Sequence, residues 1–119
     1  MDMVEVARVK RAIESEHFVS RVFTAAETEY CKSRGQQASQ SFAARFAAKE
    51  AVLKAFGTGL RGGKLTDIEV LPDELGCPQV QLTGYFAKLA QEKGVKKIWL
   101  SLTHTKEYGA AQCVMEAEG

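Results

Sequence analysis

The spacing of hydrophobic and polar residues along the 119-residue chain predicts short helices and strands arranged around one long helix. Helical patterns occupy four segments, 6–16, 25–33, 41–56 and 84–93, and a capping-box pattern of Thr24 and Glu27 starts the second of them. Apolar and polar residues alternate, as in half-buried strands, in four others, 67–71, 78–83, 97–103 and 108–116. These two periods are typical of amphipathic helices and of β-strands, and the turn at 73–76 makes a hairpin of the first two strands. The pattern predicts an α+β fold in which an antiparallel β-sheet packs on the long helix.

The long helical segment, 41–56, contains no glycine or proline and is rich in residues that lose little entropy in a helix. Ser39 and Ser41 are possible N-cap residues, and Gly57 stands where a left-handed residue commonly ends a helix. At about 100° per residue, four side chains form one apolar stripe, which we expect to face the core. The stripe consists of Phe42, Phe46, Leu53 and Phe56.

Glu50 lies beside this stripe, and Lys54 follows four residues later on the same side of the helix. One interpretation is a solvated ion pair, which contributes roughly 0.2 to 0.5 kcal/mol to helix stability. The other is a partly buried carboxylate that binds a metal or a phosphate together with nearby cations, because such a group is costly to desolvate unless something pairs with it. Spacing by itself favours the solvated pair.

Composition places the chain among globular proteins with a single domain, residues 1–119. The hydrophobic fraction of 45% and the charged fraction of 26% are ordinary, and the length leaves no room for a second core. The chain has no run of about 18 apolar residues, which predicts that no segment spans a membrane. The N-terminal segment is charged and lacks the apolar stretch of a signal peptide.

Charge and cysteine content narrow the possible functions. Sixteen basic and 15 acidic residues give a formal net charge of +1, which argues against a general nucleic-acid-binding protein. Cys31, Cys77 and Cys113 are odd in number, widely spaced and without a CxxC motif. They indicate reduced, mostly structural thiols of a cytoplasmic protein and argue against a zinc site.

Two further features have an ordinary interpretation when the residues are taken alone. The helix predicted over 6–16 exposes the basic residues Arg8, Lys10 and Arg11, and such a cluster is usually a solvated face. His104 and Thr105 lie in the turn between the last two predicted strands, where a histidine is usually a polar surface residue.

The residues Phe46 to Lys54, FAAKEAVLK, match the signature F/W-x-x-K-E-A/S-x-x-K of the 4′-phosphopantetheinyl transferases. Three further stretches agree with the short bacterial branch of that family, the holo-[acyl-carrier-protein] synthases. These stretches are 2–6, 45–46 and 101–108. They occur in the order and at the spacing of the family, so the chain resembles that branch over essentially its whole length.

The resemblance implies transfer of the 4′-phosphopantetheine group from coenzyme A to a serine of an acyl carrier protein, in fatty acid biosynthesis. The other product is adenosine 3′,5′-bisphosphate. It also implies Mg²⁺ as cofactor, because magnesium prefers oxygen ligands and often uses one or two carboxylates together with waters and phosphate oxygens. Asp2 and Glu50 occupy the positions of the family's metal ligands, and the catalytic residues that it implies are Asp2, Glu50 and Lys54.

The family also implies where the two substrates bind. The coenzyme A contacts that it implies are Arg45, Lys49, Lys54, His104 and Thr105. The helix over 6–16 would dock the acyl carrier protein through Arg8 and Arg11. The short-branch proteins form homotrimers with active sites between subunits. We therefore expect Asp2, Glu50 and Lys54 from one subunit to meet the His104 turn of a neighbour.

One departure from the family concerns Asp2. Family members carry a short strand of the form I-x-G-I-G ahead of this aspartate, whereas only Met1 precedes it here. Residues near a chain terminus are often poorly ordered, so either the first strand is missing and Asp2 frays, or something unusual holds Asp2 in place. The alternative function is a non-catalytic module that binds acyl carrier protein or a nucleotide, which a disordered Asp2 without bound metal would favour.

Overall fold

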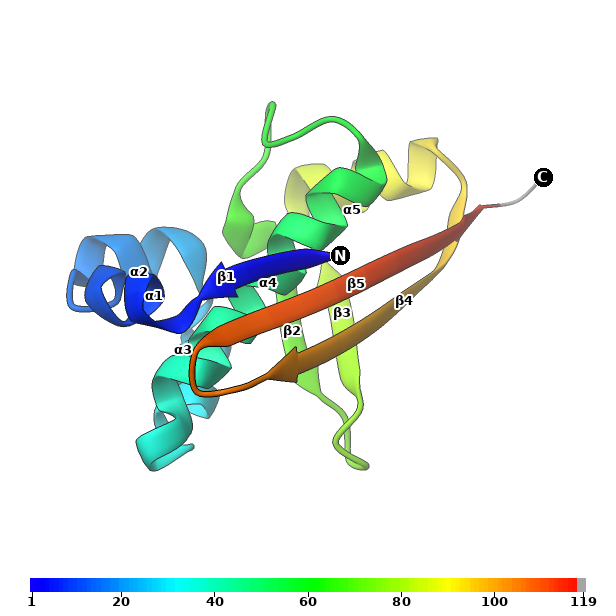
Figure 1. Ribbon diagram of the computed structural model, residues 1–119. Helices are drawn as coiled ribbons and strands as arrows, with labels where there is room; N and C mark the ends of the chain where they lie inside the picture. The colour runs from blue at the N-terminus through cyan, green and yellow to red at the C-terminus, as the bar shows by residue number, and fades with distance from the viewer. Residues whose placement is uncertain (118–119) are drawn as a thin grey trace.

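The computed structural model describes residues 1–117 and has the α+β architecture that the sequence predicts (Figure 1). Its helices are α1 (Val6–Ala12), α2 (Glu16–Val22), α3 (Ala25–Lys32), α4 (Ala38–Phe56) and α5 (Gly84–Glu92), with short 3₁₀ turns η1 (Gly35–Gln37) and η2 (Leu65–Asp67). Its strands are β1 (Asp2–Glu5), β2 (Ile68–Pro72), β3 (Pro78–Leu82), β4 (Val95–His104) and β5 (Tyr108–Ala117).

The strands form two antiparallel sheets that lie against α4. The larger sheet has the order β1-β5-β4, so the first strand of the chain pairs with the last. Asp2 is opposite Ala111 in this pairing, and Leu100 of β4 is opposite Cys113 of β5. The smaller sheet is the predicted hairpin β2-β3. In Figure 1 the long β4-β5 ribbon crosses α4. Helices α1, α2 and α3 lie near the end of this ribbon where β4 and β5 are joined.

Helix α4 is the centre of the core because small residues let its neighbours approach closely. A Cβ atom added to Gly109 of β5 would lie 2.6 Å from the backbone nitrogen of Ala44. On the sheet side, α4 packs with Ile68, Val70 and Phe86, while its other side packs with α1 to α3. The helix is therefore buried around most of its circumference, which is more than the predicted single stripe.

The prediction of one helix over 6–16 is wrong, because the chain turns between α1 and α2. Helix α1 ends at Ala12, and Ser15 then starts α2 by accepting a hydrogen bond from the Phe18 backbone N–H at 3.2 Å. Ser15, as a possible N-cap residue, was therefore the sequence signal that could have predicted the start of this second helix. The turn lets α1 and α2 fold against each other, so that Val9 and Val22 share one hydrophobic cluster.

The long helix begins earlier than predicted, at Ala38, and neither Ser39 nor Ser41 caps it. Its other end agrees with the sequence, since Gly57 has the left-handed φ of 78°. Helix α3 has the predicted capping box of Thr24 and Glu27. The hairpin, α5 and the two C-terminal strands also lie where their patterns indicated.

Of the two alternatives for Asp2, the structure has the ordered one. Asp2 belongs to β1, and only 8% of the residue is exposed, because β5 holds the strand in register. Within residues 1–117, none of the helices is both long and apolar enough to cross a membrane.

Candidate active site

A pocket of about 590 Å³ is formed by β1, α1, α2 and α4. Its walls combine two carboxylates and two cations with apolar side chains. They consist of Met1, Asp2, Met3, Val4, Arg8, Val9, Ala12, Phe18, Phe46, Glu50 and Lys54. The pocket thus brings together the three predicted catalytic residues, Asp2, Glu50 and Lys54, with Arg8, which was predicted to dock the carrier protein.

Helix α4 supplies one wall through three residues at intervals of four. Phe46, Glu50 and Lys54 follow one another along one face of the helix, since residues four apart lie about one turn apart. Lys54 stands near the C-terminal end of α4, where a cation interacts favourably with the helix dipole. The helix therefore presents an apolar ring, a carboxylate and an ammonium in succession.

Strand β1 places Asp2 opposite Lys54. The Lys54 Nζ lies 2.7 Å from Asp2 Oδ1, with 9% of the Asp2 side chain and 70% of the Lys54 side chain exposed. The hydrogen bond and the negative charge of Asp2 raise the pKa of Lys54, and the charge of Glu50 adds to this effect. The ion pair that Lys54 makes is with Asp2, so the predicted contact between Glu50 and Lys54 is not the one that forms.

The donor set of the pocket fits magnesium. Asp2 and Glu50 offer carboxylate oxygens, which this hard cation prefers. Residues 1–117 contain no cluster of three or more His, Cys, Asp or Glu side chains placed to enclose a metal. Magnesium does not require such a cluster, because waters and phosphate oxygens commonly complete its coordination.

The two predicted docking residues occupy different positions on α1. Arg8 is exposed and lines the pocket, next to the buried Val9. Arg11 is also exposed but lies outside the pocket lining. A partner protein that covers the exposed face of α1 would therefore approach the pocket from the Arg8 side.

The buried position of Lys49 contradicts the prediction that its side chain reaches the phosphates of a nucleotide. Its side chain is 0% exposed, and its Nζ lies 2.8 Å from Glu27 Oε1 inside the core. Burial lowers the pKa of Lys49, and the adjacent Glu27 carboxylate opposes that shift. The residue points away from Glu50 because adjacent helical positions are about 100° apart.

Arg45 also lies outside the pocket. Its guanidinium carbon is 4.6 Å from the centre of the Tyr30 ring of α3, and its Nη1 donates to Ser41 Oγ at 3.1 Å. Only 6% of the residue is exposed. The structure places Arg45 in the contact between α3 and α4, so it does not join Glu50 and Lys54.

His104 and Thr105 are exposed at the far end of α4. The His104 Nδ1 is 2.8 Å from Gln40 Oε1, and Thr105 Oγ1 accepts hydrogen bonds from the backbone N–H groups of Glu107 and Tyr108. Gln40 and Glu50 are ten residues apart on one helix, which corresponds to about 15 Å. One chain therefore does not bring the His104 turn to its own pocket.

Sequence reasoning missed the aromatic part of the pocket. Phe18 and Phe46 lie with their ring centres 6.2 Å apart and form its apolar wall. Phe46 was assigned to the core stripe, although its position one turn before Glu50 was a signal that both share a face. Phe18 carried no comparable signal, because its place depends on the turn between α1 and α2.

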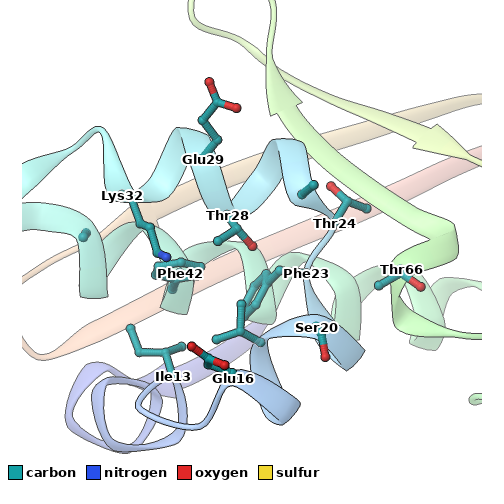
Figure 2. A pocket seen from close by; sticks show the side chains of 13 residues that line it. Ile13, Glu16, Ser20, Phe23, Thr24, Thr28, Glu29, Lys32, Phe42 and Thr66 are labelled. Carbon is teal, nitrogen blue, oxygen red and sulfur yellow. The ribbon is translucent and has the colours of Figure 1, made fainter.

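A larger hollow than this pocket lies elsewhere, an open groove of about 1040 Å³ beside α2 and α3 (Figure 2). Figure 2 shows Phe23 and Phe42 at its centre, with Thr24, Thr28 and Lys32 around them. None of the residues predicted to bind or transfer a group lines this groove. The chemistry of the smaller pocket therefore identifies it as the candidate active site.

Comparisons with known proteins show the family of the chain. A family model described as the 4′-phosphopantetheinyl transferase superfamily matches residues 1–113. The chain is 47% identical over 117 residues to a holo-[acyl-carrier-protein] synthase of Ruminiclostridium cellulolyticum, covering 96% of this chain and 87% of that protein.

Solved structures give the same result. The crystal structure of holo-[acyl-carrier-protein] synthase from Neisseria meningitidis superposes with a TM-score of 0.86 at 31% identity, covering 97% of this chain and 94% of that one. A synthase from Bacillus anthracis in complex with coenzyme A (3′,5′-ADP) superposes with a TM-score of 0.80 at 32% identity, covering 98% and 93%.

Proposed function

Because the chain belongs to the 4′-phosphopantetheinyl transferase superfamily, we propose that it transfers the 4′-phosphopantetheine group of coenzyme A to a serine of an apo acyl carrier protein. The products are holo acyl carrier protein and adenosine 3′,5′-bisphosphate, and the reaction serves fatty acid biosynthesis in the cytoplasm. The observation that carries the proposal is the pocket in which Asp2, Arg8, Glu50 and Lys54 meet. The named relatives and the coenzyme A complex of the Bacillus anthracis protein support it.

The residues of the pocket suit attack on a pyrophosphate. The serine hydroxyl gives its proton to Glu50, directly or through a water, as its oxygen bonds to the phosphorus nearest the pantetheine. The bond from that phosphorus to the bridging oxygen breaks, and adenosine 3′,5′-bisphosphate leaves with that oxygen. Lys54 offsets the charge that develops on the phosphate oxygens. Its side chain is 70% exposed, so the ammonium can turn from Asp2 toward a phosphate at small cost.

Asp2 and Glu50 would hold the Mg²⁺ ion that we propose as cofactor. When bound, magnesium neutralises charge on the pyrophosphate and fixes its orientation. The protein contributes two carboxylates from separate elements, β1 and α4, whose relative position the β1-β5 pairing determines. Arg8 at the rim of the same pocket would meet an acidic surface of the carrier protein.

We further propose that the active protein is a homotrimer in which the His104 turn of one subunit completes the pocket of its neighbour. The distance along α4 supports this arrangement, since His104 contacts the end of the helix opposite Lys54. The outer face of the larger sheet offers a surface for assembly. It exposes Met3, Trp99 and Val114, each by about half. In such an assembly His104 and Thr105 would bind coenzyme A.

The deciding experiment is intact-mass spectrometry of an apo acyl carrier protein after incubation with this protein, coenzyme A and Mg²⁺. We expect a mass increase of about 340 Da, the phosphopantetheine group, which EDTA prevents. Carrier protein that binds without gaining this mass would contradict the transfer function and favour a non-catalytic binding module. A mass increase that persists in EDTA would contradict the role of Asp2 and Glu50 as metal ligands.

A further inference from the structure

A closed network of polar groups lies inside the protein, on the side of α4 that faces away from the pocket. At its centre the Lys49 Nζ is 2.8 Å from Glu27 Oε1, and both side chains are 0% exposed. The same ammonium donates to the backbone carbonyls of Leu65, at 2.9 Å, and Ile68, at 2.5 Å. All three donors of the ammonium group are thereby used.

The Glu27 carboxylate is equally well satisfied. Its Oε1 accepts from the Thr24 backbone N–H at 2.8 Å, and its Oε2 accepts from the Val70 N–H at 2.7 Å. The Thr24 hydroxyl donates in turn to Glu69 at 2.6 Å. The network therefore joins the start of α3, the middle of α4, η2 and β2, four segments that are separate in the sequence.

Net stability alone does not account for such a pair. The desolvation of two charges offsets much of their attraction, and apolar residues of similar volume often serve as well in a core. What an apolar pair does not reproduce is direction, because hydrogen bonds fix the angle as well as the distance between the segments that they join. The contribution specific to Lys49 and Glu27 is therefore geometric.

The segments that the network fixes are those around the pocket. Lys49 directly precedes Glu50, and Lys54 follows on the same helix. Leu65 is also the point where the glycine-rich segment 57–64, which leaves the end of α4, returns to the core. The Gly57 N–H bonds to the Leu53 carbonyl at one end of this segment, and Lys49 holds the Leu65 carbonyl at the other.

We propose that Lys49 and Glu27 are positioning residues for the transfer reaction. They set the rotation of α4 about its axis and the return of segment 57–64, so that Glu50 and Lys54 face the phosphates of coenzyme A. The inference rests on the transfer function proposed above. Helix α1, which carries Arg8, is not part of the network. The effect therefore falls on coenzyme A and on turnover, and the docking of the carrier protein is spared.

The test compares the single variant Glu27→Gln with the double variant Glu27→Leu/Lys49→Met, which removes both charges and leaves neither partner buried alone. For each we would measure Tm, kcat, the KM for each substrate, and the Kd for coenzyme A by calorimetry without carrier protein. We expect kcat/KM for coenzyme A to fall about tenfold or more, with the KM for carrier protein unchanged. In the double variant this loss persists even where Tm returns to that of the wild type.

Val22→Ala is the matched control, because it shortens a buried side chain of α2 outside the network. It should lower Tm without changing either KM.

The positioning role is overturned if the double variant folds, and then binds and turns over coenzyme A like the wild type. It is also overturned if both KM values rise together in the control and in the network variants alike. If Glu27→Leu/Lys49→Met fails to fold, the Kd of Glu27→Gln for coenzyme A decides by the same criterion. A wild-type protein that yields no adduct would instead refute the transfer function itself.

Discussion

Lys49 and Glu50 are adjacent on α4, yet their side chains have opposite environments. Lys49 is enclosed with Glu27 in the core, whereas Glu50 is half-buried and lines the pocket. The rotation of about 100° between successive helical residues accounts for the difference. At the scale of single residues, we propose separate roles for the two, one in positioning and one in chemistry, although a single sequence signature contains both.

Glu50→Gln should abolish transfer and leave the fold intact. The change removes the carboxylate charge at nearly constant volume, and the loss of a metal ligand removes several kcal/mol of transition-state stabilisation, which corresponds to about a hundredfold or more in kcat. The measurement is the rate of adduct formation by intact mass, with circular dichroism to check folding. Glu92→Gln, at the exposed end of α5, is the matched control. Undiminished turnover of the Glu50 variant would remove Glu50 from the catalytic site.

The three cysteines should react with iodoacetamide in an order set by burial. Burial raises the pKa of the Cys31 thiol and that of the Cys113 thiol. Each therefore forms less of the reactive thiolate near pH 8. Cys77 is exposed in the turn between β2 and β3. Peptide mapping should therefore find Cys77 modified first, with the reaction of Cys113 accelerating as the pH rises. Modification of Cys31 ahead of Cys77 in the folded protein would contradict the burial of Cys31.

At the scale of elements, the site depends on how closely α4 approaches its neighbours. Strand β5 runs against the N-terminal half of the helix at Gly109, and the same strand holds β1 and therefore Asp2. Helix α1 then follows β1 directly and places Arg8 at the rim. A change in the packing of β5 on α4 should thus affect stability first and the position of Asp2 second.

Gly109→Ala should destabilise the protein by about 1–3 kcal/mol, the usual effect of overfilling a packed core. The added methyl carbon would lie 2.6 Å from the Ala44 backbone nitrogen and 2.7 Å from the Ala43 carbonyl carbon, and neither backbone can yield without moving the helix. Thermal unfolding measures the effect as a Tm lowered by several degrees. Gln91→Ala, on the exposed side of α5, should leave Tm nearly unchanged. Equal Tm values for the two variants would show that β5 lies further from α4.

Arg8→Glu should raise the KM for acyl carrier protein by about tenfold or more and change the KM for coenzyme A much less. Replacing a rim cation by an anion turns attraction to an acidic partner into repulsion. Steady-state kinetics with each substrate varied in turn measure the two values, and added salt should reduce the difference. Lys88→Glu on the exposed side of α5 is the matched control for charge reversal. Equal effects of Arg8→Glu on both KM values would count against docking through α1.

At the scale of the whole molecule, the candidate site is divided between the two ends of α4. Asp2, Glu50 and Lys54 share the pocket, while His104 contacts Gln40 at the opposite end of the helix. Closed cyclic assemblies place one end of a subunit against a different surface of the next. The exposed Met3, Trp99 and Val114 on the outer face of the larger sheet are the surface that such an assembly would cover.

Mixing two inactive variants tests this division directly. Glu50→Gln and His104→Ala should each have low activity alone, and dissociating and reassembling them together should restore about a quarter of the sites if subunits combine at random in a ring. Transfer activity and mass by light scattering are the measurements. No recovery from subunits that have exchanged, or a monomeric mass for the fully active protein, would contradict a site shared between subunits.

The sequence by itself determined the elements whose signals are local. The helical period over 41–56, the capping box at Thr24 and Glu27 and the hairpin turn predicted elements that the structure contains, because caps, turns and periodicity act between residues close in the chain. The signature from Phe46 to Lys54 likewise predicted Glu50 and Lys54 as site residues, and both line the pocket.

Only the tertiary structure decided the contacts between distant segments. It ordered Asp2 through pairing with β5, gave Lys54 the partner Asp2 in place of Glu50, and turned Lys49 toward Glu27 in the core. It also broke the N-terminal helix at Ser15 and brought Phe18 to the pocket. The physical reason is that burial and partner choice depend on which surfaces meet when the chain closes, and a local pattern of residues specifies the face that is buried but not what lies against it.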